Sequence, residues 1–466
     1  MIMKIKHTLD IFVILFAISI IFLNPVFGQD KIAKVNWPQF RGVQASGVAD
    51  APDVPVKWDV ESGLNIKWRA PIQGLGLSSP VVWGNKIFIT TVVREDRVDE
   101  SPSLKVGLYG NIDSEEENYN HLYQVICIEK DTGKTLWNQT AHKGIPKVKR
   151  HTKSSHANCS VATDGKHVVV FFGSEGLYCY NMDGNLIWKK ELGFLNPGFF
   201  AVPSAQWGFA SSPVIHNGRV ITQCDVNGQS FIAAFNADTG EEVWRTNREE
   251  SAGWSTPTVV NVNGKEQIVV NGWHRRGGYD FETGEEIWFM DGGGDIPVPT
   301  PIIAHGMSFY SSAHGPMAPL YAIKLDARGD ISLKKGESTN KYVVWSYPRR
   351  GAYMPTPIIV GDYLYVANIN GILTVYKAGT GEEVYQEQKL GGVRGAYTAS
   401  PVSAGNKIYF SDEDGNIHVI QAGPIYKHLA TNSMKESILA SPAIAGKMIF
   451  IRTSKALYGI ENMGKE

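Results

Sequence analysis

Aromatic and basic side chains recur shortly before a Ser/Thr-Pro dipeptide that this sequence repeats, and the loops expected between the second and third strands after it add His274 and His314. Flat rings stack on planar or sugar-like ligands, and guanidinium groups pair with carboxylates. If the dipeptides begin strands at one opening of the molecule, these side chains crowd that opening. The alternative is that the rings only fill the centre and the arginines are solvated. The predicted ligand-binding residues are Lys153, His156, Trp207, Trp254, His274, His314, Arg350, Tyr353, Arg394 and Tyr397.

Catalytic and metal-binding patterns are weaker. A nucleophile elbow of the form Gly-x-Ser-x-Gly is missing from the sequence. His151, His156 and Cys159 are types that bind zinc or copper, but their spacing fits no motif, and a hydrogen-bonded loop is the better interpretation. Residues 412–415 (Asp-Glu-Asp-Gly) resemble part of a calcium loop but lack downstream ligands, which favours a hairpin turn. We therefore predict no catalytic residue and no metal site.

The dipeptide that orders these candidates is part of a long repeat. It is followed by β-branched residues, a glycine turn and a second apolar run. Three of the seven steps between copies are 44 residues long. A period near 44 without helical stretches is typical of β-propeller blades, each built from four short strands. The copies are Ser79-Pro80, Ser212-Pro213, Thr256-Pro257, Thr300-Pro301, Thr356-Pro357, Ser400-Pro401, Ser441-Pro442 and, with valine in place of proline, Ser160-Val161.

A second element alternates with the first. It is a turn of the form Asp-Thr-Gly followed by an apolar residue and tryptophan, as in residues 131–137 and 238–244. Glycine tolerates the positive φ of a tight turn, and the tryptophan of an outer strand can fill the wedge between neighbouring blades. The last copy of the repeat lacks such an outer strand, whereas residues 65–69 have its pattern. The predicted fold is all-β: an eight-bladed β-propeller of four-stranded antiparallel blades, with the last blade closed by this N-terminal strand.

Other segments fall outside the repeat. Residues 1–28 have the charged start, 13-residue apolar stretch and small residues of a cleavable signal peptide, with an uncleaved anchor as the alternative. Residues 29–64 form an N-terminal extension, and 65–466 form the propeller. The insertions 94–121 and 326–341 are predicted to be surface loops, either solvated or partner-binding. The four cysteines stand singly, and Cys127 and Cys179 are expected to be buried free thiols.

The Asp-Thr-Gly and Trp element and the opening residues 37–42 (Trp-Pro-Gln-Phe-Arg-Gly) resemble the PQQ-like repeat family, β-propellers similar to quinoprotein alcohol dehydrogenases. The resemblance covers residues 65–461 and identifies the chain as an exported bacterial member of unassigned function. For a true quinoprotein dehydrogenase it implies adjacent cysteines, a calcium site of Glu, Asn and Asp, and a tryptophan floor. Trp207 and Trp254 are candidates for the floor, but adjacent cysteines are absent and no residues match the calcium site.

The charge balance limits the partners. Lys and Arg number 45 against 46 Asp and Glu, and this balance argues against nucleic acid because neutralising phosphates needs a basic excess. We predict a periplasmic or secreted binding or scaffold module without catalysis or cofactor, without a membrane span after signal cleavage. Its partner is a protein or a small polar or sugar-like ligand at the propeller face. The alternative is a quinoprotein-type oxidoreductase acting on an alcohol or sugar, with PQQ and calcium.

Overall fold

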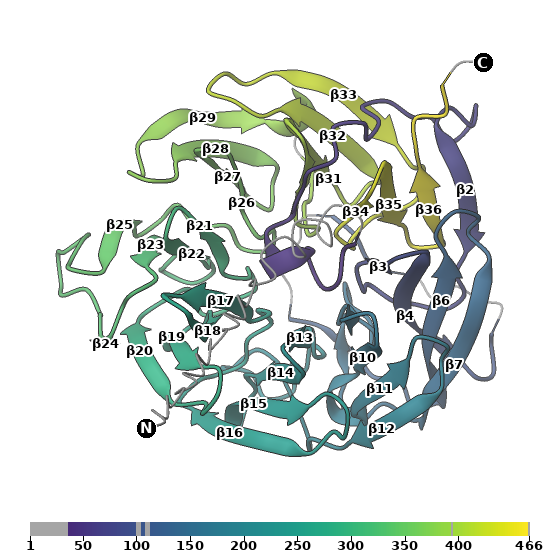
Figure 1. Ribbon diagram of the computed structural model, residues 1–466, viewed down its shortest axis with the longest axis horizontal. Coiled ribbons are helices and arrows are strands. Elements are labelled where there is room, and N and C mark those ends of the chain that lie inside the picture. Colours follow the sequence, from purple (N-terminus) through teal and green to yellow (C-terminus); the bar gives the residue numbers. More distant parts are fainter. Residues whose placement is uncertain (1–35, 99–103, 108–111, 393–394, 465–466) are drawn as a thin grey trace, which may run out of the picture.

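Eight antiparallel sheets surround a central axis (Figure 1). The computed structural model describes residues 36–98, 104–107, 112–392 and 395–464. Each sheet has four consecutive strands of the repeat, with the first strand at the axis and the fourth at the rim. Two of the sheets gain a fifth strand from elsewhere in the chain. The predicted eight-bladed propeller is therefore confirmed. The predicted signal peptide, residues 1–28, lies outside the described residues.

The blades follow the order of the chain. Blade 1 consists of β3 (Val81–Trp83), β4 (Lys86–Arg94), β6 (His121–Glu129) and β7 (Thr135–Gly144), and blade 2 of β9 (Ala162–Thr163), β10 (His167–Phe171), β11 (Leu177–Asn181) and β12 (Leu186–Lys190). Blade 3 consists of β13 (Val214–His216), β14 (Arg219–Cys224), β15 (Ser230–Asn236) and β16 (Glu242–Arg248), and blade 4 of β17 (Thr258–Val262), β18 (Lys265–Val270), β19 (Arg275–Asp280) and β20 (Glu286–Asp291).

Blade 5 consists of β21 (Ile302–Ala304), β22 (Met307–Ser311), β23 (Leu320–Lys324) and β25 (Val343–Tyr347), and blade 6 of β26 (Ile358–Val360), β27 (Tyr363–Ala367), β28 (Ile372–Lys377) and β29 (Glu383–Lys389). Blade 7 consists of β30 (Val402–Ala404), β31 (Lys407–Ser411), β32 (Asn416–Gln421) and β33 (His428–Ser433), and blade 8 of β34 (Ala443–Ala445), β35 (Met448–Arg452), β36 (Ala456–Ile460) and β2 (Ile66–Pro71). The remaining elements are β1 (Val48–Ala49), β5 (Ser114–Glu115), β8 (Arg150–His151), β24 (Gly329–Asp330) and the short helices η1 (Val43–Ala45), η2 (Gly173–Glu175) and η3 (Leu390–Gly392).

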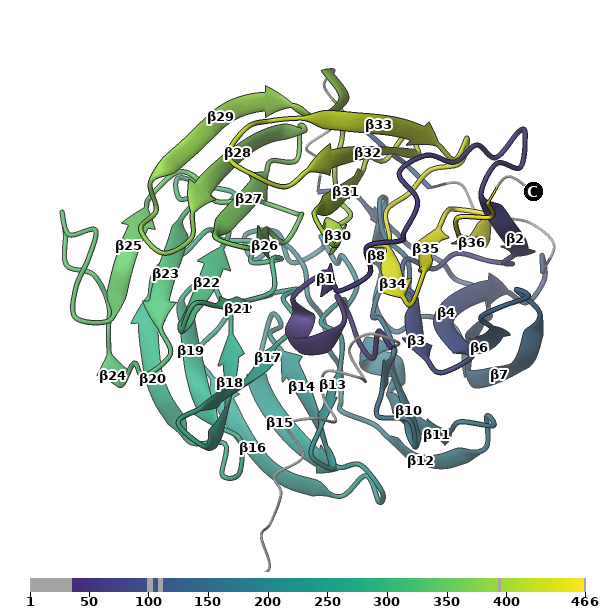
Figure 2. The same ribbon diagram turned by 45° about the horizontal axis from the view of Figure 1, so that its top comes forward.

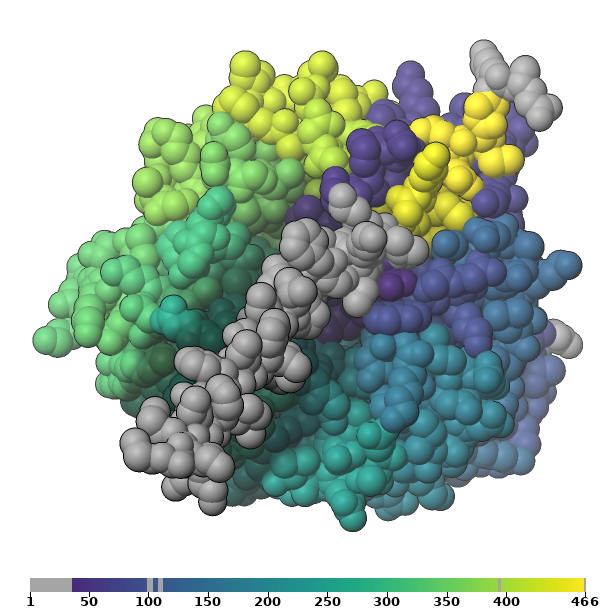
Figure 3. Space-filling model, viewed as in Figure 1, coloured from purple at the N-terminus to yellow at the C-terminus, as the bar shows by residue number. Residues whose placement is uncertain are grey.

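The ring closes through blade 8. Strand β2 from the N-terminal part of the chain pairs antiparallel with β36, from Ile66 opposite Ile460 to Pro71 opposite Ala456. In the space-filling view the purple N-terminal residues lie against the yellow C-terminal blade (Figure 3). This pairing confirms the closing strand predicted from residues 65–69. It also protects the edge of β36, which would otherwise expose unpaired backbone groups.

A ring of hydroxyl groups joins the blades near the axis. The backbone N–H of the Ser or Thr in one Ser/Thr-Pro dipeptide donates to the side-chain oxygen of the equivalent residue in the next blade. Seven such bonds, 2.9 to 3.1 Å long, connect Ser79 to Ser160, Ser160 to Ser212, Ser212 to Thr256, Thr300 to Thr356, Thr356 to Ser400, Ser400 to Ser441 and Ser441 back to Ser79. At the eighth junction the Thr300 hydroxyl is buried and has no partner among the described residues.

Tryptophans join the blades near the rim, as the sequence predicts. The indole N–H of Trp68 donates to the carbonyl of Lys130 at 2.8 Å, and its ring lies on Gly133 of the next blade. Trp188 repeats this arrangement with Ala237 and Gly240. These glycines have positive φ, and a Cβ on either would approach the indole ring within 3.0 Å. The turn glycine therefore serves both the local backbone and the packing of the preceding blade.

Residues 36–64 of the N-terminal extension lie across one end of the channel (Figures 1 and 2). Trp37 exchanges backbone hydrogen bonds with Val82 in blade 1, and β1 adds a parallel strand to β30 in blade 7. Between these contacts the buried guanidinium of Arg41 donates to the carbonyl oxygens of Pro357 at 3.0 Å and Pro401 at 2.9 Å. The extension thus forms a floor under the channel rather than a free tail.

The described residues of the two insertions lie largely on the surface, as predicted, but each insertion also makes specific contacts with the propeller. In insertion 326–341, β24 pairs parallel with β20 and extends the sheet of blade 4. In insertion 94–121, β5 pairs with β8, and the amide of Gly107 donates to Glu413 in blade 7 at 2.7 Å. Local sequence patterns do not indicate these contacts, because each contact depends on a partner far away along the chain.

Two further findings concern the described residues as a whole. No helix within them is long and apolar enough to cross a membrane. All four cysteines are buried and free, as predicted for Cys127 and Cys179. Burial raises the pKa of both of these thiols to about 12, so they are protonated and unreactive at neutral pH.

The closing junction can be tested with Trp68→Ala. The indole is buried and joins blade 8 to blade 1, so its removal should lower the free energy of unfolding by about 3–5 kcal/mol. The measurement is thermal melting followed by circular dichroism. Leu136→Ala, on the exposed face of β7, is the control and should change stability by less than about 0.5 kcal/mol. Equal effects of the two variants would contradict closure through β2.

Candidate functional site

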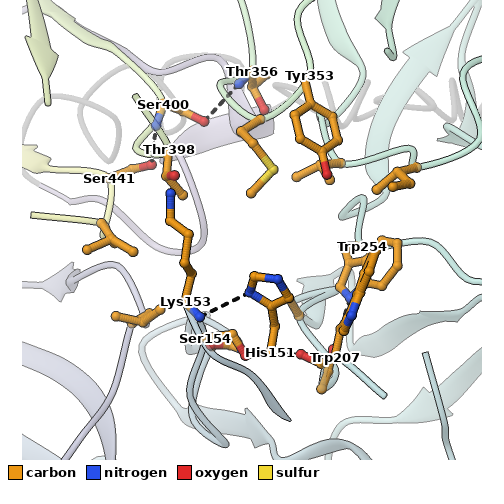
Figure 4. Close-up of a pocket in the computed structure, with 18 of the residues that line it drawn as sticks. His151, Lys153, Ser154, Trp207, Trp254, Tyr353, Thr356, Thr398, Ser400 and Ser441 are labelled. Carbon is orange, nitrogen blue, oxygen red and sulfur yellow. Dashed lines mark hydrogen bonds between the residues drawn. The ribbon is translucent and has the colours of Figure 1, made fainter. Parts of the chain in front are cut away.

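The central channel holds a cavity of about 470 Å³. Its base is formed by seven members of the hydroxyl ring, and Phe40 of the N-terminal extension lines it as well. Figure 4 shows Thr356, Ser400 and Ser441 of the ring on one side and Trp207 and Trp254 on another. Every blade contributes at least one lining residue, so the cavity exists only in the closed ring.

A second tier of side chains lies beside the hydroxyl ring. In each blade the residue two positions before the ring residue lines the cavity, because alternate residues of an extended segment point to the same side. Trp254 belongs to this tier, which is mostly apolar and spans all eight blades. Its members are Leu77, Asn158, Ala210, Trp254, Val298, Met354, Thr398 and Leu439.

Aromatic rings form one wall of the cavity. Trp207 and Trp254 lie with ring centroids 5.6 Å apart, and Phe199 stacks on the other side of Trp207 at 5.7 Å. Trp207 donates to the carbonyl of Ile112, which belongs to insertion 94–121, and Trp254 donates to Gly208. The indole N–H groups are therefore satisfied by the protein. Trp207 packs between Phe199 and Trp254, so it is the ring of Trp254 that remains for a ligand.

His314 and Tyr353 also line the cavity, and their ring centroids lie 5.8 Å apart. His314 contacts the carboxylate of Asp295 at 2.6 Å. Burial raises the pKa of Tyr353 to about 12, with a smaller contribution from Asp295, so the phenol stays protonated. The Tyr353 hydroxyl can therefore offer a hydrogen atom to a ligand at neutral pH.

Lys153 reaches across the cavity. Its ammonium group contacts Glu413 at 2.7 Å and the carbonyl of Gly107 at 2.8 Å, and Thr398 donates to the same carboxylate. Glu413 is fully buried. It occupies the turn between β31 and β32, which confirms that residues 412–415 form a hairpin turn. The pair ties blades 2 and 7 to the insertion and balances the charge of Lys153.

His156 lies outside the cavity lining, in a buried cluster centred on Glu117. The Glu117 carboxylate accepts from Arg150 at 3.0 and 3.2 Å and contacts His156 at 2.9 Å. Burial would raise the pKa of Glu117, but the hydrogen bonds from His156 and Arg150 outweigh it and hold that pKa far below its usual value. Because Arg150 precedes His151 and Lys153, the cluster fixes the loop that carries both into the cavity.

Besides His156, three described residues of the predicted site are not among the lining residues. His274 stacks on Trp273, Arg350 pairs with Glu383 at 3.3 Å, and Tyr397 is buried between blades 6 and 7. Arg394 lies outside the described residues. Tyr397 stands three positions before Ser400, so it is Thr398 that takes the second-tier position there. The cavity therefore brings together Lys153, Trp207, Trp254, His314 and Tyr353.

Sequence reasoning missed several lining residues. His151 and Phe199 line the cavity. The sequence pattern indicates His151 only as a weak metal-ligand candidate and does not indicate Phe199. Asn158 and Thr398 could have been found by counting two residues back from each ring position. Among the described residues there is no group of three or more metal-binding side chains.

The donor groups do not fit a PQQ and calcium site. Calcium in proteins takes six to eight oxygen ligands and favours carboxylates. Within the described chain, the lining residues include no aspartate or glutamate, and the nearby Glu413 is already bound by Lys153, Thr398 and Gly107. The four cysteines are separate and buried, so no disulfide of adjacent cysteines faces the cavity.

Comparison with known proteins identifies the family. A family model described as outer membrane protein assembly factor BamB matches residues 123–291 and 279–463. The chain belongs to this family of PQQ-like repeat propellers. None of the curated proteins matches it in sequence.

Solved structures of this fold include BamB-like and quinoprotein propellers. BamB from Moraxella catarrhalis is 13% identical, with a TM-score of 0.53 over 79% of this chain and 98% of that one. A europium-containing methanol dehydrogenase is 10% identical, with a TM-score of 0.50 over 92% and 91%. At these identities the likeness establishes the propeller fold of this BamB-family chain and nothing further.

The Glu117 cluster predicts a pH dependence of stability through His121, whose imidazole lies 3.6 Å from the Glu117 carboxylate. Burial lowers the pKa of His121 to about 4, so the folded protein keeps this ring neutral while the unfolded chain takes up a proton near pH 6.5. The unfolded state then binds more protons, and stability is lost as the pH falls from about 6.5 to 4. The melting temperature of His121→Gln should fall less steeply over this range. His305→Gln, at an exposed position, is the control, and parallel curves for wild type and His121→Gln would contradict the assignment.

Proposed function

We propose that this chain is an exported binding module that takes a small ligand in the central cavity and acts by binding rather than by catalysis. A central cavity with an aromatic wall supports this proposal most directly. Phe40 of the N-terminal extension lines it as well, and Trp254 offers a flat apolar face. Planar acids and sugar rings have the shape and polarity that this wall accepts.

A role as a scaffold for protein partners is compatible with the same proposal. The model of this family is described as an outer membrane protein assembly factor, and a propeller offers broad faces for contacts with other proteins. Export to the periplasm or beyond remains part of the proposal, and it rests on residues 1–28 of the sequence. The alternative of a quinoprotein oxidoreductase is disfavoured by the carboxylate-free lining of the described cavity.

Ligand binding can be tested with Trp254→Ala. A glycan array and a small set of planar organic acids identify a binder, and isothermal titration calorimetry gives its Kd. Loss of the indole face should weaken binding by about tenfold or more, because a stacked aromatic contact and its burial contribute about 1.5–3 kcal/mol. Unchanged affinity in this variant would remove the cavity from the proposal.

Phe194→Ala is the matched control. Phe194 is 62% exposed and does not line the cavity, so its variant should bind like the wild type. The same preparation should be mixed with PQQ and calcium and assayed for dye reduction with alcohols and aldoses. Turnover in that assay would favour the oxidoreductase and contradict a role limited to binding.

A further inference from the structure

The hydroxyl ring leaves seven protons without a protein acceptor. Each of the seven lining hydroxyls accepts a backbone N–H from the neighbouring blade, so its own hydrogen atom is available. Within the described residues, none of these hydroxyls donates to another protein group. All seven are less than 5% exposed and all line the cavity. Buried donors of this kind require an acceptor, because a buried donor that makes no hydrogen bond costs free energy.

Two buried guanidinium groups lie next to this ring. Arg41 donates to the carbonyl oxygens of Pro357 and Pro401, each adjacent to a ring residue. Arg452 donates to the carbonyl and hydroxyl oxygens of Ser78, which precedes ring residue Ser79. Neither guanidinium pairs with a carboxylate in the described part of the chain. Burial lowers the pKa of each to about 9, so both remain charged at neutral pH.

The lysine farther from the ring is balanced, because Lys153 is paired with Glu413. The His314 ring contacts the carboxylate of Asp295. Because the lining has no acidic side chain among the described residues, uncompensated positive charge lies at the base of the cavity. Each hydroxyl oxygen has a second lone pair that can coordinate a cation, but the two neighbouring guanidinium charges would repel a cation at this position. The base therefore selects an anion.

The tier beside the ring selects the rest of the ligand. Leu77, Val298, Met354 and Leu439 present apolar surface, and Trp254 adds a flat ring. An inorganic anion would leave this surface wet, whereas an organic acid would cover it. The ligand that satisfies both tiers has an apolar, flat body and one oxyanion end.

We propose that the hydroxyl ring is an oxyanion site that binds the carboxylate or sulfonate group of an organic acid, with the body of that acid against the second tier and Trp254. This assignment rests on the proposed binding function and names its ligand class. It differs from the arrangement predicted from the sequence, in which arginines near the strand starts hold the acidic group. Arg350 pairs instead with Glu383, away from the cavity lining.

The test compares two probes with the same body. 2-Naphthoate carries a carboxylate and 2-naphthamide carries a neutral amide of similar size, and each is titrated into the wild-type protein by calorimetry. The carboxylate should bind at least about tenfold more tightly, because hydrogen bonds to a charged group are stronger than neutral ones. This comparison needs no variant, so it does not depend on how a mutant folds.

Variants then locate the oxyanion. Ser400→Ala removes one lining hydroxyl and should weaken 2-naphthoate by about three- to tenfold while changing 2-naphthamide little. Thr300→Val is the matched control, because Thr300 occupies the equivalent position in its blade but its hydroxyl lies outside the lining. The control should bind both probes like the wild type.

The outcomes separate this inference from the proposed function. If the two probes bind equally and Trp254→Ala weakens both, the cavity binds ligands but the ring is not an oxyanion site. If neither probe binds at millimolar concentration, the oxyanion assignment is overturned, and the glycan array decides the broader proposal. A preference for the carboxylate that Ser400→Ala leaves intact would also overturn the assignment, since the acid would then sit elsewhere.

Discussion

The hydroxyl-to-amide bond between neighbouring blades is the interaction on which this structure depends. A serine or threonine oxygen accepts the N–H of its equivalent one blade back, and the bond from Ser441 to Ser79 returns the circle to its start. The following proline has no N–H of its own to satisfy at this crowded position. These bonds fix where each inner strand begins. The residues just before it must then point toward the axis in a regular order.

The cavity follows from that constraint. Once the ring residues are fixed, strand periodicity places a second tier around the same axis, and the N-terminal extension closes one end with Phe40 and Arg41. Tryptophans near the rim keep the blades in register farther out. The charges near the cavity come from different blades: Lys153 from blade 2 meets Glu413 from blade 7. The site is therefore a property of the closed circle, and no single blade carries it.

Much of the fold could be predicted because its causes are local. A 44-residue period, a turn glycine and an outer tryptophan each express a short-range physical need, and together they specify eight blades and the closing strand. Trp254 could be predicted as a site residue because it stands two positions before a ring residue. Tyr397 stands three positions before its ring residue, and its side chain is buried between blades instead. Counting in steps of two would have separated these cases.

The remaining features depend on contacts that local sequence does not encode. The partner of Lys153 lies 260 residues away, and nothing near either residue indicates the other. The acidic insertion 94–121 reads as a solvated loop, yet its Glu117 binds Arg150 and positions the cavity loop. Arg41 is an unremarkable arginine in sequence and becomes a buried charge only when the extension crosses the channel.

The most direct test of the account is a crystal structure of the protein soaked with 2-naphthoate. The account predicts one molecule in the central cavity, with its naphthalene group against Trp254. One of its carboxylate oxygens should lie within hydrogen-bond distance of at least two side chains of the protein's hydroxyl ring. Density for the probe only on the outer surface of the blades, or a carboxylate turned away from the ring, would contradict it.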